Sequence, residues 1–534
     1  MRQVIKYPLF GIVWVMDVVI RQLTRSVHTH RLLLGPGIEP ARWLGGRVRA
    51  WRTFHKASRH VPAYGAFLKQ HGHGRDIAAR GSLADALAGV PEMDKASYIR
   101  PWTVAERSLG GRMPRRGVVV DESSGSSGIP TSWVRGPDER LATRQLLQTG
   151  FWRTSRELSK QPFVLNCFSL GAWATGMNVS SSLTEITMIK SIGPDRDKVI
   201  HTMREFGPDY TYIITAYPPF LKALFDDDRL DWSQYDIVTA FGGEGISESM
   251  RAIICEHAAA AFGSYGASDL EINIAIETDF TVALRQAIAA SPELSAQLTR
   301  RSEYGVLPMI FQFNPFDYLM ETNDAGELLV TITRGTNINP RIRYNIHDRG
   351  HVLRVRDLDP VLKEHGLGGL RDVRITDLPL LFLYGRSDMS VDFNGAVVAP
   401  DSVRDAVFEA PGLADAIENH RLISYEDANG DRQLHVALQR VERADAWVAL
   451  AASEAEVGAG IIAALRAANG DFSNAIRTSP EGTLPTVGVY PYRSGPFTDD
   501  GAKLKNEYVW VLERGEIDRY NLRIDHRAPR HVTR

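Results

Sequence analysis

The chain has 534 residues, with 62 basic and 64 acidic side chains and a formal net charge of −2. This length exceeds what one hydrophobic core usually covers, so at least two domains are predicted. The near balance of charge argues against a nucleic-acid binder. Cys167 and Cys255 form no CxxC pair or Cys/His cluster, which predicts neither a disulfide framework nor a zinc site and favours a cytoplasmic location.

The N-terminal segment has basic side chains at Arg2 and Lys6, followed by an apolar run over residues 9–16. Asp17 interrupts this run, no small-residue cleavage site follows, and the run is too short to span a bilayer. We therefore expect a packed N-terminal helix and no membrane contact. A helix that lies at a membrane interface is the alternative.

Short β-branched or aromatic runs alternate with amphipathic stretches from residue 118 onward, after a mainly helical lead-in over residues 1–115. The runs are GVVV, FVLNCF, YTYIITA, DIVTAFGG and ELLVTIT. This alternation predicts an α/β domain with largely parallel strands.

A second region starts near LLFLYGRSD, at residues 380–388. Asn429-Gly430 predicts a β-hairpin within it, and residues 458–468 have helical character. The fold class is therefore α/β, with a large N-terminal α/β domain over residues 1–384 and a small C-terminal α+β domain over residues 385–534.

The stretch VVVDESSGSSGIPTSWVRG, residues 118–136, places small residues after a strand. Glycines let backbone N–H groups converge on an anion and serine hydroxyls add donors, so phosphate is the natural ligand. A P-loop would need a Gly-Lys-Ser/Thr end that leads into a helix, whereas TSWVRG predicts a second strand. A flexible surface hairpin is the alternative.

Five further motifs follow this loop in order: FGGEGIS at 241–247, SYGASDLE at 264–271, RIRYNIHDRG at 341–350, YGRSDMSVDFNGAVVAP at 384–400 and DDGAKLKNEYV at 499–509. In this order the motifs resemble those of the adenylate-forming superfamily, in particular its phenylacetate-CoA ligase-like branch. The resemblance covers most of the chain.

The resemblance implies an acid–thiol ligase with an adenylate-forming fold, whose small domain rotates about a hinge. Such an enzyme uses ATP and Mg²⁺ to convert a small carboxylic acid to an acyl-adenylate, releases pyrophosphate and passes the acyl group to coenzyme A. A carrier-protein thiol or an amine would use the same first step, and a non-catalytic nucleotide-binding homologue is a further alternative. A membrane-associated ligase of lipid acids and a homodimer are also left open.

The resemblance also implies roles for single residues. Lys503 would be the catalytic lysine, with Lys505 beside it as a solvated charge, and Asp388 would lie at the hinge. Asp269 would bind Mg²⁺, a hard cation that prefers carboxylate oxygen, with Glu271 as its competitor.

Tyr265 would stack on adenine, Ser268 would bind the α-phosphate, and Asp348 and Arg386 would bind the ribose. The complete ATP-binding set is Ser123, Ser124, Gly125, Ser126, Ser127, Gly128, Gly243, Glu244, Tyr265, Gly266, Ala267, Ser268, Asp348 and Arg386. The acyl pocket would be lined by Phe168, Trp173, Tyr217 and Gly243, with ordinary core packing as the alternative for Phe168 and Trp173.

Two positions depart from the family pattern. Ile129 stands where the family commonly has lysine. Either Mg²⁺ or Arg135 would compensate for the missing positive charge, or ATP would bind weakly. Asp269 replaces the usual glutamate, which shortens the ligand arm by one methylene group.

Overall fold

The structure is a computed structural model. It describes residues 2–23, 26–74, 87, 89–123, 131–155, 157–304, 306–372, 377–387, 390–427, 429–442, 447–448, 450, 452–479, 481–498, 508–512 and 517.

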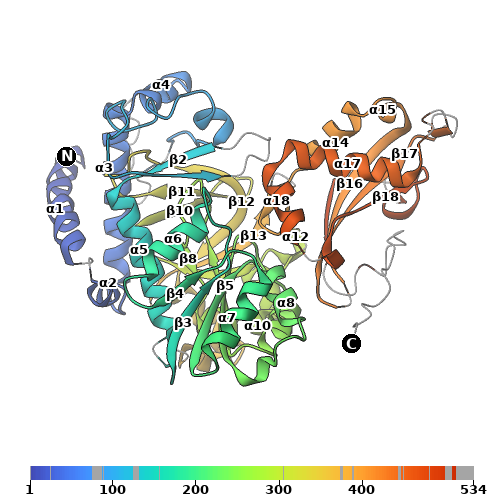
Figure 1. Cartoon of the computed structure of the whole chain (residues 1–534). Helices are drawn as coiled ribbons and strands as arrows, with labels where there is room; N and C mark the ends of the chain where they lie inside the picture. Colours follow the sequence, from blue (N-terminus) through green and yellow to red (C-terminus); the bar gives the residue numbers. More distant parts are fainter. Residues whose placement is uncertain are drawn as a thin grey trace.

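The N-terminal region consists of helices that cover one side of the large domain (Figure 1). They are α1 (Arg2–Leu23), α2 (Val27–Leu33), α3 (Glu39–His60), α4 (Pro62–Gln70) and the π-helix η2 (Lys95–Ile99). Trp51 and Phe54 of α3 are buried in the main hydrophobic core, so α3 packs directly on the body of the domain.

The large domain is built on an eleven-stranded sheet in the order β10-β11-β12-β13-β9-β8-β7-β6-β5-β3-β4. Its parallel half consists of β3 (Gln161–Asn166), β4 (Met188–Ser191), β5 (Tyr210–Ala216), β6 (Asp236–Gly242) and β7 (Ala261–Tyr265). The intervening helices are α6 (Ala174–Leu183), α7 (Arg196–Phe206), α8 (Pro218–Phe225) and α9 (Glu248–Cys255), with the 3₁₀ turn η3 (Trp232–Gln234) before β6. The predicted α/β class is confirmed by this half.

The other half of the sheet is antiparallel, so the expectation of largely parallel strands is wrong there. Its strands are β8 (Ala275–Ile276), β9 (Met309–Phe313), β10 (Tyr318–Thr322), β11 (Glu327–Ile332), β12 (Tyr344–Leu353) and β13 (Leu380–Arg386). A short turn rather than a helix joins β10 to β11, and such hairpins force antiparallel pairing. β13 also belongs to this sheet, so the second region begins after it.

The remaining helices of the large domain are α5 (Pro137–Ser155), α10 (Asp279–Ala290), α11 (Pro292–Leu298), α12 (Arg301–Tyr304), α13 (Val355–Glu364) and the 3₁₀ helix η4 (Gly368–Asp372). A separate two-stranded sheet pairs β1 (Val119–Ser123) with β2 (Thr131–Arg135), and Ser123 lies opposite Thr131. The predicted second strand is therefore confirmed, while residues 124–130 lie outside the described residues.

The C-terminal domain has a four-stranded sheet in the order β18-β17-β16-β19 and a hydrophobic core of its own. The strands are β16 (Ile417–Glu426), β17 (Arg432–Arg440), β18 (Thr486–Tyr490) and β19 (Val509–Leu512), with the small ribbon β14 (Val391–Phe393) and β15 (Ala396–Val398). The helices are α14 (Pro400–Glu409), α15 (Leu413–Ala416), α17 (Glu454–Ala468), α18 (Gly470–Thr478), η5 (Glu481–Thr483) and η6 (Gly495–Phe497). The Asn429-Gly430 hairpin and the helix over 458–468 are both confirmed.

The tip of the β16–β17 hairpin contacts the large domain. Lys222 Nζ of α8 lies 3.1 Å from Asp431 Oδ1, and the Ser249 hydroxyl of α9 donates to Glu426 Oε1 at 2.8 Å. These contacts fix one arrangement of the two domains, and rotation about a hinge stays a prediction.

A buried ion pair ties β7 to the helices behind it. Arg251 Nη2 lies 2.7 Å from Glu277 Oε1, and both side chains are almost fully buried. Glu277 Oε2 also accepts a hydrogen bond from the Gly263 backbone N–H at 2.6 Å. Glu277 therefore holds the strand that leads to Tyr265.

Substitution Glu277→Ala should lower the free energy of unfolding by about 3 kcal/mol, because it leaves the buried Arg251 charge short of its main partner. Urea unfolding followed by circular dichroism measures this loss. The matched control is Glu185→Ala, which removes an exposed pair with Arg144 and should cost less than about 1 kcal/mol. Equal losses in the two variants would contradict the assignment.

Candidate active site

The predicted site residues follow four neighbouring parallel strands at the points where the strands end. β3, β5, β6 and β7 end at Asn166, Ala216, Gly242 and Tyr265. The carboxyl ends of parallel strands meet at one edge of a sheet, where open α/β folds bind their ligands. Phe168, Tyr217, Gly243 and the turn after Tyr265 therefore share this edge although they are far apart in sequence.

The turn after β7 requires glycine at position 266. A Cβ atom there would lie 2.7 Å from the Asn273 nitrogen and 2.7 Å from the Glu271 carbonyl oxygen. The Ala267 N–H donates to the Glu271 carbonyl at 3.2 Å, which closes the turn. The turn thus has one tight backbone path, on which Ser268 and Asp269 are presented.

Two buried guanidinium groups hold this turn. Arg135 Nη1 donates to the Leu270 carbonyl at 2.6 Å, and a second Arg135 nitrogen donates to the Ser268 carbonyl. Arg341 Nε donates to the Asp269 carbonyl at 2.7 Å. Arg135 Nε also lies 3.4 Å from Asp121 Oδ2. Because the Arg135 guanidinium is engaged by Asp121 and by the carbonyls of the turn, these contacts argue against the expectation that Arg135 replaces the lysine missing at position 129.

Tyr265, Asp348 and Arg386 meet at the same edge. Asp348 on β12 is the register partner of Arg386 on β13. The Tyr265 hydroxyl donates to Asp348 Oδ2 at 2.7 Å, while one side of its ring packs against Phe311. Burial and the Asp348 charge raise the pKa of Tyr265 well above its usual value, so the hydroxyl stays protonated and remains a donor.

Asp269 has donors on both carboxylate oxygens. Lys95 Nζ lies 3.1 Å from Oδ1, and the Tyr344 hydroxyl donates to Oδ2 at 2.8 Å. Among the described residues no three His, Cys, Asp or Glu side chains form a group that could hold a metal. With Lys95 in this place, the described side chains do not fit a Mg²⁺ ion held by Asp269. Sequence analysis missed Lys95, because η2 lies far from Asp269 in the chain and carries no motif.

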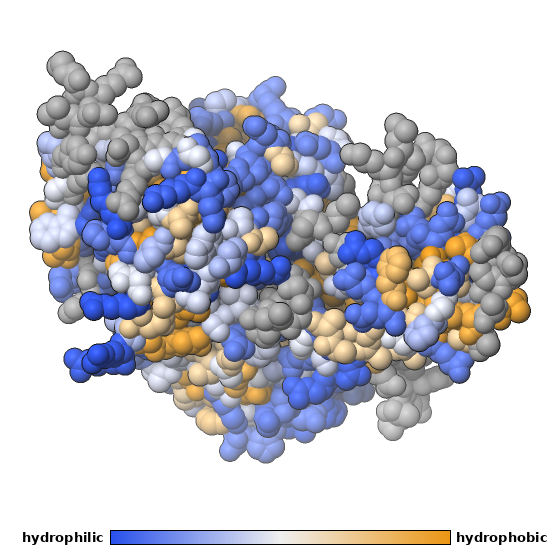
Figure 2. All heavy atoms as spheres, turned by 90° about the horizontal axis from the view of Figure 1, so that it is seen from above, coloured by the Kyte–Doolittle hydropathy of each residue, from blue (hydrophilic) through white to orange (hydrophobic). Residues whose placement is uncertain are grey.

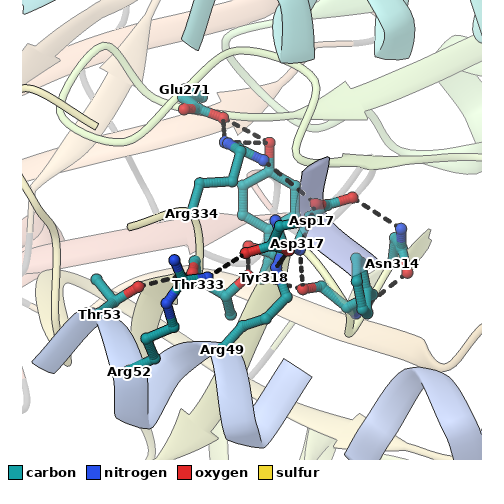
Figure 3. A network of polar contacts seen from close by, with 11 residues as sticks. Asp17, Arg49, Arg52, Thr53, Glu271, Asn314, Asp317, Tyr318, Thr333 and Arg334 are labelled. Atoms are coloured by element: carbon teal, nitrogen blue, oxygen red, sulfur yellow. Dashed lines mark hydrogen bonds and ion pairs between the residues drawn. The ribbon is translucent and has the colours of Figure 1, made fainter. Parts of the chain in front are cut away.

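Glu271, the alternative metal ligand, belongs to a separate buried network (Figure 3). It accepts a hydrogen bond from the Tyr318 hydroxyl at 2.6 Å and pairs with Arg334. The network continues to the N-terminal helices through Asp317 and Arg49. Glu271 therefore has a structural role that links the β7–β8 turn to α3.

Tyr217 lies at the junction of the two domains. Its ring meets Phe168 edge to face at 5.2 Å, and Gly243 and Gly395 touch it so closely that a Cβ atom would come within 2.5 Å and 2.7 Å of the ring. Gly395 belongs to the small domain, which therefore covers this tyrosine. A cavity of about 60 Å³ adjoins it, lined by Ser169, Trp173, Pro194, Tyr217, Phe220, Asn394, Gly395, Asp471, Asn474, Thr478 and Ser479.

Two carboxyl groups at this junction have raised pKa values. Burial raises the pKa of Glu244 to about 8, with a further rise from Asp392 of the small domain and an opposing effect of Arg432. Glu244 Oε1 is buried and has no hydrogen-bond partner among the described residues. Burial also raises the pKa of Asp471 to about 7, against the opposing charge of Lys95.

Several predicted residues lie outside the described residues. They are Ser124, Gly125, Ser126, Ser127, Gly128, Asp388 and Lys503, together with Ile129 and Lys505. Ser123, the last residue of β1, is described, and its buried hydroxyl has no hydrogen-bond partner within the described part of the chain. The roles of all the site residues, described or not, stay predictions.

No protein-family model matches this chain, and neither does any curated protein. Among solved structures, 2-hydroxyisobutyryl-CoA ligase in complex with 2-HIB-AMP and CoA in the thioesterification state is similar, at 15% identity and a TM-score of 0.61, over 91% of this chain and 92% of that one. The same ligase in the postadenylation state with 2-HIB-AMP gives 16% identity and a TM-score of 0.49, over 89% and 90%. The amide bond synthetase McbA from Marinactinospora thermotolerans gives 16% and 0.41, over 73% and 69%. The first of these matches shows that this chain has the adenylate-forming fold.

Substitution Glu244→Gln should flatten the pH dependence of stability between pH 5 and 8. In this window the folded protein keeps a proton on Glu244 that the unfolded chain has released, so stability falls as pH rises, by up to about 1.4 kcal/mol per pH unit. The variant keeps no such proton and should gain stability relative to the wild type as the pH approaches 8. Urea unfolding at several pH values, with Glu185→Gln as control, measures the effect; parallel profiles for wild type and Glu244→Gln would contradict it.

Proposed function

We propose that the protein converts a carboxylic acid and ATP to an acyl-adenylate and pyrophosphate, and then transfers the acyl group to coenzyme A. One observation carries this proposal: Tyr265, Asp348 and Arg386 converge at the carboxyl edge of the sheet in a chain with the adenylate-forming fold. The similar solved protein is a CoA ligase with an acyl-AMP and CoA bound. Membership of the phenylacetate-CoA ligase-like branch remains a prediction.

Asp348 would bind the ribose through its carboxylate, which the Tyr265 hydroxyl orients. A carboxylate has about four acceptor sites on its two oxygens, and the Tyr265 hydroxyl occupies one of them on Oδ2. Carboxylate oxygens of this kind can accept hydrogen bonds from a vicinal diol. Tyr265 therefore orients Asp348, and Arg386 on the neighbouring strand adds donors to the same place.

In the first step a carboxylate oxygen of the acid attacks the α-phosphorus, and the bond from this phosphorus to the bridging oxygen breaks, so that pyrophosphate leaves with the bond electrons. Lys503 would offset the negative charge that builds as two anions approach. The Ser268 hydroxyl would donate to the α-phosphate. The loop from Ser123 to Gly128 would hold the departing phosphates.

In the second step a thiol sulfur attacks the acyl carbon, the bond from this carbon to the phosphate oxygen breaks, and AMP leaves while the thiol proton is released. The acyl group would lie beside Phe168, Tyr217 and Gly243, where the small domain contacts the large one. Trp173 lines the adjoining cavity. This arrangement would place the reacting carbonyl where domain movement can change its surroundings.

Pyrophosphate release from ATP, measured across aryl and fatty acids with and without coenzyme A and followed by mass spectrometry, tests the function. An acid-dependent signal with an acyl-CoA product is expected. If an adenylate formed without any acyl-CoA, the acceptor would be a carrier-protein thiol or an amine instead of coenzyme A. No signal with any acid would contradict the proposal and favour a non-catalytic nucleotide-binding protein.

Substitution Lys503→Ala should lower the rate of adenylate formation by at least about 100-fold, since it removes charge stabilisation made in the transition state, while ATP affinity stays within about threefold. Acid-dependent exchange of labelled pyrophosphate into ATP gives the rate, and calorimetry with ATP gives the affinity. Lys505→Ala is the matched control and should retain activity. Equal losses in both variants would contradict the assignment of Lys503.

Substitution Asp348→Asn should weaken ATP binding by about 10-fold or more, because hydrogen bonds to a charged acceptor contribute about 1.5–3 kcal/mol. The Tyr265 hydroxyl can still donate to the amide oxygen, so the fold should be kept. Calorimetric titration with ATP measures the change. If 2′,3′-dideoxy-ATP bound the wild type as tightly as ATP does, Asp348 would not be the ribose ligand.

A further inference from the structure

The inner face of α1 is fixed by its only acidic residue. Asp17 Oδ1 lies 2.8 Å from Arg49 Nε and Oδ2 lies 2.7 Å from Arg52 Nη1, both on α3 (Figure 3). Val13, one turn earlier, is buried against the same side. Residues four apart share one face of a helix, so these contacts define which side of α1 faces the protein.

Between residues 12 and 19 the outer face of α1 is apolar. Six large apolar side chains on it or at its borders are 44–57% exposed: Ile12, Trp14, Val15, Met16, Val18 and Val19. Trp14, Met16 and Val18, at the borders, also line a cavity of about 320 Å³ between α1 and the large domain. Apart from the inward-facing Asp17, residues 7–20 contain no charged side chain. A helix that turns its single acid inward and its apolar residues outward is typical of a surface that meets a non-aqueous partner.

Exposed apolar residues are concentrated in this part of the molecule. Nine of the seventeen large apolar side chains that are exposed in the described chain lie between residues 12 and 44, the other three being Leu32, Ile38 and Leu44. Figure 1 places α1 on the side of the large domain away from the C-terminal domain, and Figure 2 shows apolar surface at that edge. The C-terminal domain therefore leaves this surface uncovered.

The same segment is basic although the whole chain is not. Residues 1–38 contain Arg2, Lys6, Arg21, Arg25 and Arg31 against the single acid Asp17, a net charge of +4, whereas the chain as a whole carries −2. In sequence, two of these basic residues lie toward each end of α1. Apolar residues between two basic ends match a lipid surface with anionic head groups.

A second copy of the chain fits this surface less well. An antiparallel pair of α1 helices would bring the basic N-terminal end of one copy against the basic C-terminal end of the other, and a parallel pair would bring like ends together. Anionic head groups neutralise both ends at once. No helix among the described residues is long and apolar enough to cross a membrane, so the geometry fits a helix that lies along the surface.

We propose that the outer face of α1 binds the head-group and acyl boundary of an anionic membrane and so holds the protein at a lipid surface. This is the alternative that sequence analysis set beside a packed helix without membrane contact. The Asp17 pair with Arg49 and Arg52 keeps α1 on the large domain while its apolar side enters the bilayer interface. The proposal is independent of the reaction at the carboxyl edge of the sheet.

Sedimentation of the full chain with vesicles tests this inference. The protein should pellet with vesicles of phosphatidylcholine and phosphatidylglycerol, and much less with phosphatidylcholine alone. The double substitution Val15→Glu and Val19→Glu should lower the partition coefficient at least about tenfold. The matched control is the double substitution Phe408→Glu and Val448→Glu, which alters side chains that are 69% and 76% exposed elsewhere on the protein. This control should bind vesicles as the wild type does. Both double variants should release pyrophosphate at the wild-type rate when no vesicles are present.

Quenching by brominated lipids tests the same surface without added charge. Brominated phosphatidylglycerol vesicles should quench part of the tryptophan fluorescence of the wild type, and Trp14→Phe should remove most of that quenching. Equal quenching in both proteins would overturn the proposal, as would failure to pellet with anionic vesicles. The surface would instead belong to a contact between two copies if the wild type bound no vesicles and light scattering showed a dimer that the double substitution converts to a monomer.

Discussion

The buried guanidinium groups of Arg135 and Arg341 determine the geometry of the candidate site. Together they donate to the backbone carbonyls of Ser268, Asp269 and Leu270. Burying two cations is costly unless their donors find acceptors, and these carbonyls accept from three of their nitrogens. Because Arg135 comes from β2, it also fastens the β1–β2 hairpin to the turn after β7. Two segments predicted to contact the same nucleotide are thereby held together before any ligand binds.

Charge is distributed unevenly around this turn. Lys95 pairs with Asp269, and its charge also lowers the pKa of Asp471, which burial raises. One cation therefore acts on both carboxyl groups. Glu244, beside the ring of Tyr217, is half-buried, and Asp392 of the small domain adds to the rise of its pKa. Because Asp392 belongs to the small domain, a change in the position of that domain would change its effect on the pKa of Glu244.

Much of the fold could be predicted because its signals are local. The β-branched runs predict the parallel strands, Asn429-Gly430 predicts its hairpin, and the ordered motifs predict that Tyr265, Asp348 and Arg386 belong to one site. The antiparallel half of the sheet could not be read from alternation alone, because its pairing depends on turns and long-range register. The partners of Asp269 were missed for the same reason: Lys95 and Tyr344 reach it only through the tertiary fold.

The N-terminal helix shows a different limit of sequence analysis. Its apolar run predicts a packed helix, with an interfacial helix as the alternative, because the pattern does not say which side meets the protein. The contacts of Asp17 with Arg49 and Arg52 decide that question by fixing the inner side. Once the acid is turned inward, Val13 is buried with it, while Ile12, Val15 and Val19 are left exposed on the opposite side.

The carboxyl edge of the sheet is proposed to bind an adenylate. A crystal structure of the protein with AMP would show whether it does. The ribose hydroxyls are expected to lie within hydrogen-bond distance of the Asp348 carboxylate and of Arg386. The adenine should lie beside Tyr265 and the phosphate at Ser268. A nucleotide bound elsewhere, or an Asp348 carboxylate that contacts only Tyr265 in crystals containing AMP, would contradict the proposal.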